Sequence, residues 1–311
     1  MNRVVFMGTP EFALPALAIL SERYELVGVY TQPDKPAGRG QHLTPPPIKQ
    51  WAQKHGLPVF QPRTLRDESA QAQLAELKPE VIVVAAYGLL LPKFVLDLPP
   101  HGCINVHASL LPKYRGAAPI PAAILHGESR TGITLMRMDE GLDTGPIIAQ
   151  DSIPIEPDYT TGDVAVWLAL LGAQLIAETL PRWIAGEITP QLQDESQATF
   201  APKLHKEEGR LDWSRSAIEL DRRVRAFSPW PGTFTTWNGR SLRVLSVQVT
   251  GQDAQGTPGM VVKDEKEIGV VTGDGLLRLR EVQPEGKRAM SAADFARGQP
   301  SFTGSVLGAQ A

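Results

Sequence analysis

The chain has 311 residues, of which 42% are hydrophobic, and it carries a formal net charge of −3 at pH 7. This length exceeds the usual size of one domain, so we expect two domains, and the hydrophobic content is that of a globular protein. The single cysteine, Cys103, excludes an internal disulfide and favours a reducing compartment, while the slightly acidic total gives no general sign of a nucleic-acid partner.

The N-terminal residues, MNRVVFMGTP, enter a predicted buried strand directly. They lack the charged leader, the apolar region and the cleavage site of a secretory signal. No continuous apolar run approaches the roughly 20 residues of a membrane span. The sequence therefore predicts a soluble, cytoplasmic protein with no membrane partner.

Short apolar strands alternate with helical segments in the first half of the chain. Strands are expected at residues 4–7, 26–30, 59–60, 81–86 and 103–107, and helices at residues 10–23, 48–55 and 69–77. The continuous apolar run at 81–86 is typical of a strand buried on both faces. The alternation predicts an α/β fold with a Rossmann-like, doubly wound and mainly parallel sheet, in which ligands bind at the C-terminal ends of the strands.

A segment rich in proline and glycine lies between the second strand and the next helix. Residues 31–49 read TQPDKPAGRGQHLTPPPIK, and their charges are Lys35, Arg39 and Lys49 against Asp34 alone. Prolines and glycines at this density predict a long irregular loop. Such a loop is either functional or a simple solvated excursion, and the residues alone leave both readings open.

The strand at 103–107 ends in chemically active residues. Side chains two apart on a strand share a face, so Asn105, His107 and Ser109 should project together, into an accessible cleft. A carboxamide donor beside an imidazole suits acyl transfer, because one group can bond a developing oxyanion while the other moves a proton. A buried structural histidine is the alternative reading. Asp143, in the turn GLDTG, is either an orienting partner for His107 or ordinary turn chemistry.

Beyond residue 107 the pattern of strands and helices continues, and it changes in character after residues 229–232. Further strands are expected at 133–137 and 147–153, and a long helix at 161–185, followed by a helix at 214–227 with Ser214 as its N-cap. Short strands then follow at 233–237, 242–250, 259–262, 269–272 and 276–282, which suggests a small β-barrel such as the OB fold. We therefore expect an α/β domain at 1–188, a linker at 189–207 and a C-terminal barrel domain at 208–311.

Several common kinds of site are excluded because the sequence lacks their motifs. Gly8-Thr9-Pro10 does not match the dinucleotide fingerprint, and Pro10 removes an amide that a phosphate would use. There is no Walker loop, HExxH or paired CxxC, so no metal site is expected. Cys103 is expected to be a small buried apolar residue.

With these residues in view, the chain resembles the 10-formyltetrahydrofolate-dependent formyltransferases. The resemblance rests on Asn105-x-His107 followed by SLLPKYRGAAPI, and on Asp143 within GLDTG. The segments GTPEFALPAL, TQPDKPAGRG, AFSPWPGTF and KRAMSAADF are similar to those of family members that act on a charged initiator tRNA, and the match spans nearly the whole chain.

The resemblance implies a role for each matching position. Asn105, His107 and Asp143 would be catalytic, with protonated His107 and Asn105 stabilising an oxyanion and Asp143 favouring the charged imidazole. Ser109, Leu110, Leu111 and Pro112 would line the folate site, and Lys35 and Arg39 would lie on a loop that contacts tRNA. The donor would be 10-formyltetrahydrofolate, with no metal, and the acceptor the amino group of initiator methionyl-tRNA, held partly by the barrel.

Two other readings remain open at this level. The same catalytic domain could pass the formyl group to water or to a small amine, although neither acceptor needs the 31–49 loop or the barrel. A non-catalytic RNA-binding module is the second alternative, and intact Asn105, His107 and Asp143 argue against it. The run from Tyr87 to Pro92 fits either a wall for the pteridine ring or core packing. Nothing in the sequence demands more than a monomer.

Overall fold

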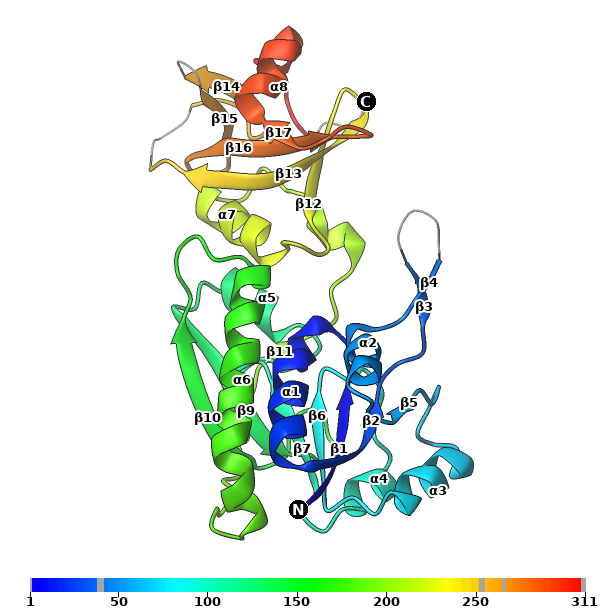
Figure 1. Cartoon of the computed structure of the whole chain (residues 1–311). Helices are drawn as coiled ribbons and strands as arrows, with labels where there is room; N and C mark the ends of the chain where they lie inside the picture. The colour runs from blue at the N-terminus through cyan, green and yellow to red at the C-terminus, as the bar shows by residue number, and fades with distance from the viewer. Residues whose placement is uncertain (1, 38–41, 252–254, 265–266, 309–311) are drawn as a thin grey trace. The chain divides into compact units, whose positions relative to one another are not determined.

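The chain forms two structural units in a computed structural model, which describes every residue except 1, 38–41, 252–254, 265–266 and 309–311. The first unit contains residues 1–119, 130–154 and 165–201. The second contains residues 120–129, 155–164 and 202–311. Each unit is built on its own main sheet (Figure 1).

The sheet of the first unit has the strand order β10-β9-β7-β6-β1-β2-β5. Its strands are β1 (Arg3–Gly8), β2 (Glu25–Tyr30), β5 (Val59–Phe60), β6 (Val81–Ala85), β7 (Cys103–His107), β9 (Arg130–Arg137) and β10 (Ile147–Pro154). Neighbouring strands pair in parallel across the series β5, β2, β1, β6 and β7. At the β7 edge, β9 pairs antiparallel with β7, and β10 pairs antiparallel with β9. The predicted mainly parallel sheet is confirmed.

Helices pack against this sheet and hold β7 in place. They are α1 (Leu14–Arg23), preceded by the 3-10 turn Glu11–Ala13, α2 (Pro47–Lys54), α3 (Glu68–Glu76), α4 (Lys93–Asp97) and α6 (Thr161–Ile184). On one face, Leu74 of α3 and Val95 of α4 join the core around Ile82. α6 lies beside α1 and packs on β7 at Gly172, where an added Cβ would be 2.9 Å from Val106 (Figure 1).

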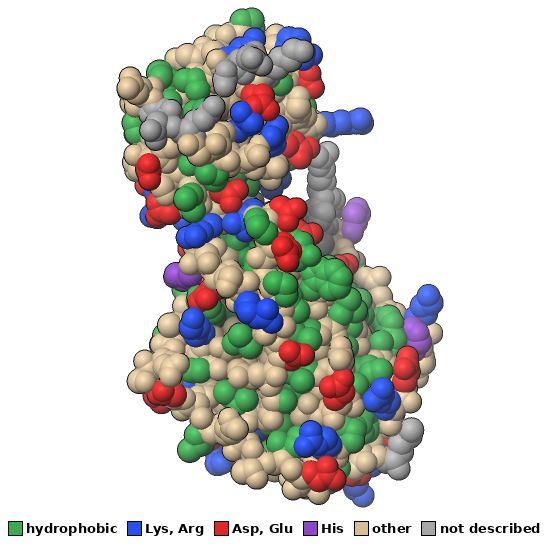
Figure 2. Space-filling view, turned by 90° about the vertical axis from the view of Figure 1, so that its left-hand side faces the viewer, with side chains coloured by type: hydrophobic (Ala, Val, Ile, Leu, Met, Phe, Trp, Pro, Cys, Tyr) green, Lys and Arg blue, Asp and Glu red, His purple; other side chains and the backbone are tan. Residues whose placement is uncertain are grey.

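Helix α6 bears on the prediction that the chain has no membrane span. It has 24 residues, and one window of 18 of them is apolar enough that by length and composition it could cross a membrane. Half of that window is buried, and the core helix of a soluble protein meets the same criterion. Val166, Trp167 and Leu170 are exposed on it. The view toward α6 and β10 shows apolar side chains interspersed with charged ones (Figure 2).

The 31–49 segment is more regular than its composition predicts. β3 (Lys35–Ala37) and β4 (His42–Thr44) form a short antiparallel hairpin, and α2 already begins at Pro47. The expectation of an irregular loop was wrong for these stretches, because proline is tolerated on an edge strand and at the first turn of a helix. Asp34 anchors the base of the hairpin, accepting from Lys49 Nζ at 2.8 Å and from Gln61 Nε2 at 2.8 Å.

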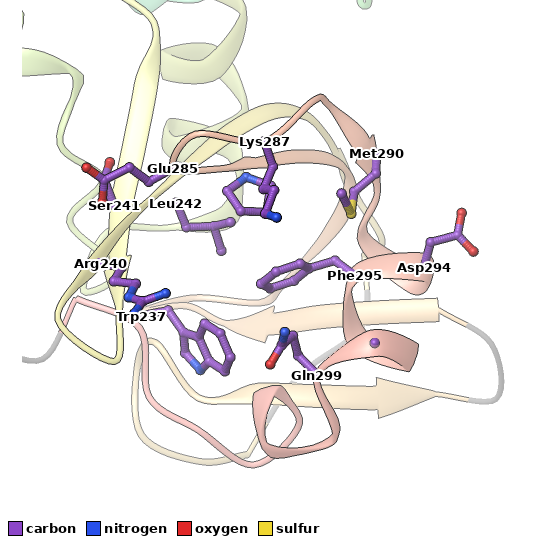
Figure 3. Close-up of a pocket in the computed structure, with 12 residues that line it drawn as sticks. Trp237, Arg240, Ser241, Leu242, Glu285, Lys287, Met290, Asp294, Phe295 and Gln299 are labelled. Carbon is purple, nitrogen blue, oxygen red and sulfur yellow. The ribbon is translucent and has the colours of Figure 1, made fainter.

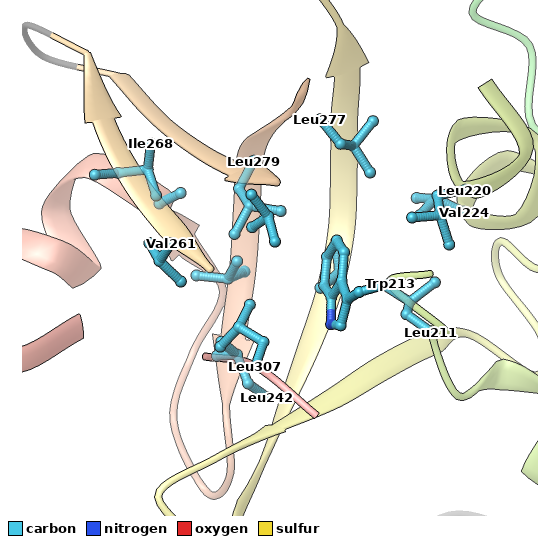
Figure 4. Packing of buried hydrophobic residues seen from close by; sticks show 14 of the residues in the cluster. Leu211, Trp213, Leu220, Val224, Leu242, Val261, Ile268, Leu277, Leu279 and Leu307 are labelled. Carbon is cyan, nitrogen blue, oxygen red and sulfur yellow. The ribbon is translucent and has the colours of Figure 1, made fainter. Parts of the chain in front are cut away.

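The second unit contains an antiparallel sheet with the order β12-β13-β16-β15-β14, and β17 pairs with β16. The strands are β12 (Thr233–Trp237), β13 (Arg240–Val249), β14 (Val261–Asp264), β15 (Glu267–Val271), β16 (Leu276–Pro284) and β17 (Met290–Ser291), with helices α5 (Pro119–Leu125), α7 (Ala217–Ala226) and α8 (Ala292–Gly298). Trp213, Leu220 and Leu277 belong to its core (Figure 4).

Residues 305–308 connect the two edges of this sheet. Leu307 N–H donates to the Gly259 carbonyl beside β14 at 2.8 Å, and Gly308 N–H donates to the Thr236 carbonyl of β12 at 2.9 Å. The buried Leu307 side chain joins the core between them (Figure 4). This bridge closes the sheet into the small barrel expected from the sequence, and the fold class of an α/β domain followed by a barrel is confirmed.

A hollow of about 350 Å³ opens on the barrel beside α8 (Figure 3). Its apolar wall includes Trp237 and Phe295, whose rings meet edge to face at 5.4 Å. Its lining also carries charges of both signs, from Arg240, Lys287, Glu285 and Asp294. Because these charges balance, the hollow has no clear preference for an anionic or a cationic partner.

Helix α7 is capped by Ser216 and not by the predicted Ser214. Ser216 and Glu219 form a reciprocal capping box, in which Glu219 N–H donates to Ser216 Oγ and Ser216 N–H donates to the Glu219 carboxylate. Ser214 Oγ instead donates to Asp212 at 2.6 Å. The prediction was wrong because a capping box needs Glu three residues after the cap, and only Ser216 has one.

Ser216→Ala should therefore lower the free energy of unfolding by about 1 kcal/mol, because it leaves a helix N-terminal amide without its acceptor. Chemical denaturation followed by circular dichroism measures this effect. Ser214→Ala is the matched control and should cost clearly less. Equal losses for the two variants would contradict the assignment of Ser216 as the cap.

Candidate active site

β7 places Asn105 and His107 on the same side of the sheet. Asn105 pairs with Val84 of β6 and with Met136 of β9, one strand on each side. Both side chains meet the carboxylate of Asp143: Asn105 Nδ2 donates to Oδ1 at 3.4 Å, and His107 Nδ1 lies 3.6 Å from Oδ2. The structure thus brings together the three residues that were predicted to be catalytic.

The turn carrying Asp143 is held in an unusual backbone conformation. Asp143 has φ of +52°, in the left-handed region that aspartate tolerates better than most residues. Gly145 is required here, because an added Cβ would overlap the Arg137 carbonyl. Asp139 closes the turn by accepting from Gly141 N–H at 3.0 Å and Thr144 Oγ at 2.7 Å. Asp143 is therefore both a turn residue and a partner of His107, so the two readings of the sequence are compatible.

His107 is buried, with 5% of its surface exposed, so the expectation of an accessible cleft was wrong for this side chain. Its Nε2 lies 3.1 Å from the Tyr114 carbonyl, which can only accept, so Nε2 carries a proton. Burial lowers the pKa of His107, while the Asp143 charge and the Tyr114 carbonyl act in the opposite direction. Asp143 favours the charged imidazole, but burial has the larger effect and leaves the pKa of His107 below its usual value.

Two backbone groups complete the site. The Tyr114 carbonyl accepts from His107, and Gly116 N–H donates to Asp143 Oδ2 at 2.8 Å. Backbone groups carry no signature of residue type, so the sequence analysis did not identify them. In the sequence, Arg115 and Gly116 are visible only as part of the run SLLPKYRGAAPI that carries the family resemblance.

The segment predicted to line a folate site follows β7 as a fixed turn. Ser109 Oγ donates to the Lys113 carbonyl at 2.6 Å, and Leu111 N–H donates to Thr134 Oγ1 at 3.0 Å. Ser109 and Leu111 are buried, whereas Leu110 and Pro112 are partly exposed. Only Leu110 and Pro112 therefore present side-chain surface to a ligand.

The apolar run from Tyr87 to Pro92 divides between the two readings that the sequence left open. Tyr87 is buried in the core beside β6, whereas the side chain of Leu90 is 76% exposed. A hollow of about 540 Å³ borders the Asp143 turn, and its lining includes Lys93, Arg137 and Glu140. Tyr87 therefore packs the core, while the exposed Leu90 side chain is free to contact a ligand.

Of the two residues predicted to contact tRNA, Lys35 lies at the start of β3. Lys35 is exposed, and its ammonium bonds the Gln32 side chain. Arg39 lies outside the described residues. No contact of Lys35 in the described part of the chain joins it to Asn105, His107 or Asp143.

Metal and thiol chemistry have no candidate residues in the described part of the chain. No group of three or more His, Cys, Asp or Glu side chains there could hold a metal ion. Burial raises the pKa of Cys103 to about 12, and its Sγ donates to the Val95 carbonyl at 3.4 Å. Cys103 is therefore a buried thiol and not an activated nucleophile.

This fold and site belong to a known class. The formyl transferase family model matches residues 1–180, and the model of the formyl transferase C-terminal domain matches residues 203–300. The chain therefore belongs to the formyl transferase family, a family of enzymes.

Its relatives within that family are similar over nearly their whole length. The methionyl-tRNA formyltransferase of Marinobacter nauticus is 49% identical, over 95% of this chain and 96% of the relative. The methionyl-tRNA formyltransferase of Methylococcus capsulatus is 50% identical, over 94% of this chain and 96% of the relative.

Solved structures of lower identity share the fold. The sugar 3N-formyl transferase WlaRD, crystallised in the presence of dTDP and 5-N-formyl-THF, has a TM-score of 0.68 at 17% identity and covers 93% of this chain and 99% of its own. The N-formyltransferase from Helicobacter canadensis, in complex with folinic acid and dTDP-3-aminofucose, has a TM-score of 0.69 at 19% identity and covers 91% of this chain and 100% of its own.

Proposed function

We propose that this enzyme transfers the formyl group of 10-formyltetrahydrofolate to the free α-amino group of methionyl-initiator-tRNA, giving formyl-methionyl-tRNA for translation initiation. The central observation is that Asn105 and His107 converge on the Asp143 carboxylate at the end of β7. Relatives that are about half identical over nearly the whole chain, and that are named for this reaction, support it. Hydrolysis and small-amine transfer, the alternatives from the sequence, are not favoured by those names.

The proposed chemistry needs no protein nucleophile, because the substrate amine fills that role. A carbon–nitrogen bond forms between the α-amino nitrogen and the formyl carbon, and the bond from that carbon to N10 of the folate breaks. Asn105 donates to the formyl oxygen as negative charge develops there, since among the described residues its amide makes a single long bond, at 3.4 Å. Because Asn105 already lies on β7, this donation requires no rearrangement of the sheet.

His107 moves the proton in this scheme. Neutral imidazole accepts a proton from the attacking nitrogen and returns it to the departing N10. The imidazolium that forms in between faces two acceptors, the Tyr114 carbonyl and the Asp143 carboxylate, which stabilise its charge. On this proposal the proton is accepted at Nδ1, which is unprotonated in the neutral ring because Nε2 donates to the Tyr114 carbonyl.

The folate is proposed to bind beside the turn that follows β7, where Leu110 and Pro112 keep exposed surface. Related structures crystallised with 5-N-formyl-THF or folinic acid support a folate in this fold. Catalysis is assigned to residues 1–188 and tRNA binding to residues 208–311 together with the hairpin. A monomer in the cytoplasm is sufficient for this activity.

The direct test is incubation of the full chain with 10-formyltetrahydrofolate and initiator tRNA charged with methionine. Formyl-methionine on the tRNA is the expected product, detected after release of the amino acid. A reaction in which free formate accumulates at the same rate with and without tRNA would show a hydrolase and contradict the proposal.

Lys35→Ala should raise the KM for charged tRNA several-fold and leave folate binding unchanged. Loss of one phosphate contact should also flatten the dependence of log KM on log salt by roughly one unit. Arg39→Ala should behave in the same way. KM measured across a salt series, with Lys54→Ala on α2 as the control, tests both, and salt slopes equal to that of the control would exclude these contacts.

A further inference from the structure

Residues 191–201, here called the strap, are the last segment of the first unit. They run along both loops of the active site, the Asp143 turn and the segment that follows β7. Gln191 exchanges two backbone hydrogen bonds with Ile147, at 2.7 and 2.8 Å, just after the Asp143 turn. At its other end, β11 (Phe200–Ala201) pairs with β8 (Arg115–Gly116). Thr199 accepts from Arg115 N–H at 2.9 Å. The strap therefore contacts the segments on both sides of the Asp143–His107 pair.

Gln193 joins these two segments through its side chain. Its Nε2 donates to the Asp143 carbonyl at 2.8 Å and to the Gly145 carbonyl at 2.7 Å. Its Oε1 accepts from Arg115 Nε at 3.1 Å and Nη2 at 2.8 Å. Both amide protons and the carbonyl oxygen are thus used, which fixes the orientation of the carboxamide.

Arg115 explains why Gln193 occupies a definite position. Only 1% of its surface is exposed, and a buried guanidinium requires partners for its N–H groups. Glu195 supplies two further bonds, at 2.9 and 2.7 Å. The chain neighbours of Arg115 are Tyr114, which accepts from His107, and Gly116, which donates to Asp143. Movement of Arg115 would therefore disturb both members of the pair.

We propose that Gln193 is a positioning residue that sets the geometry of Asp143 against His107 by tying together their two loops, with Arg115 and Glu195 holding Gln193 in place. The kinetic consequence of this inference rests on the proposed function. The strap lies between the two stretches matched by the family models, which end at residue 180 and begin at residue 203.

The distance between Asp143 and His107 should be sensitive to loss of the bonds that Gln193 makes. The distance from His107 Nδ1 to Asp143 Oδ2 is already 3.6 Å, beyond a normal hydrogen bond. Asp143 also holds a left-handed backbone conformation that costs free energy unless its surroundings maintain it. Without Gln193, two carbonyls of the turn lose their donor, and the bonds from Gly116 N–H and Asn105 Nδ2 are left to hold the carboxylate near the imidazole.

Two variants of the full-length protein separate the functions of the carboxamide. Gln193→Ala removes every bond, whereas Gln193→Glu keeps an acceptor for Arg115 and removes the donor to the Asp143 turn. Gln197→Ala is the matched control, because Gln197 is an exposed glutamine of the strap that bonds only Asp194. We expect both Gln193 variants to lower kcat by roughly 10- to 100-fold, with KM for folate and tRNA within threefold of wild type.

A substrate-free readout separates this inference from the proposed function. NMR titration of the His107 imidazole should show a lower pKa in Gln193→Ala than in the Gln197→Ala control, because Asp143 no longer lies close enough to stabilise the charge. If Gln193→Ala does not fold, Gln193→Glu, whose folding is checked by thermal denaturation, decides. An unchanged His107 titration in folded Gln193→Ala, or an unchanged kcat in folded Gln193→Glu, overturns the proposal. A wild-type protein that fails to formylate methionyl-tRNA contradicts the proposed function alone.

Discussion

Replacement of Asn105 or His107 by alanine should reduce the turnover number for formyl transfer by about 100-fold or more. This is the usual scale for loss of one oxyanion donor or of a proton-transfer group. Asn105 carries the donor at the end of β7, and His107 is its neighbour on the same face. Single-turnover formation of formyl-methionyl-tRNA, measured at saturating substrates, reports the chemical step directly.

Because His107 is buried, its alanine variant could lose stability as well as chemistry, so His107→Asn is the more informative change. Its side-chain amide replaces Nδ1 beside Asp143 but cannot carry a proton between two nitrogens. His101→Ala serves as the control, since His101 lies in the same unit outside the site. Turnover of His107→Asn or Asn105→Ala within a few-fold of wild type, in folded protein, would remove these side chains from the mechanism.

Asp143→Asn should lower turnover by about 100-fold while changing folate affinity little. Asparagine tolerates the left-handed backbone, and its oxygen can still accept from Gly116 N–H, so the turn should persist. The lost negative charge is one that raises the pKa of His107 against the effect of burial. The pKa of His107 should therefore fall further, which makes the imidazole a weaker proton acceptor.

The direction in which the pKa of His107 changes in Asp143→Asn tests the electrostatic role of Asp143. NMR titration should place the midpoint of His107 at lower pH in Asp143→Asn than in wild type, and Asp151→Asn on β10 should leave it unchanged. A midpoint at higher pH would contradict the electrostatic role of Asp143. Loss of folate binding in proportion to turnover would instead make Asp143 a ligand contact.

The parts of the fold that could be predicted depend on patterns local in sequence. The alternation of Ile104 and Val106 with Asn105 and His107 is a property of one short strand, and it places the polar pair on one face. The apolar run at 81–86 likewise predicted the fully buried strand β6. The residues alone left the association of Asp143 with His107 open against ordinary turn chemistry, and the resemblance to a family favoured it, because nothing within either segment specifies contact across 36 residues.

What could not be predicted depends on contacts between distant segments. Gln193 lies in a polar stretch without periodicity, and its importance appears only when Arg115, far earlier in the chain, is seen to be buried. The closure of the barrel through Leu307 involves neither a regular strand nor a sequence motif. The β3–β4 hairpin was missed for a different reason, since its prolines argue against a strand unless its edge position is known.

The strap also bears on how this protein can be divided or extended in the laboratory. The exposed turn at Gly186, which follows α6 directly, looks from the sequence like the natural place to cut the chain, insert a label or exchange the barrel for another. A cut there would detach residues 191–201 and with them the donor to the Asp143 turn and the partners of a buried arginine. The joint that leaves the chemistry intact comes after Ala201, where the first unit ends. Chimaeras joined at that point should keep the active site of this chain, whatever barrel they carry.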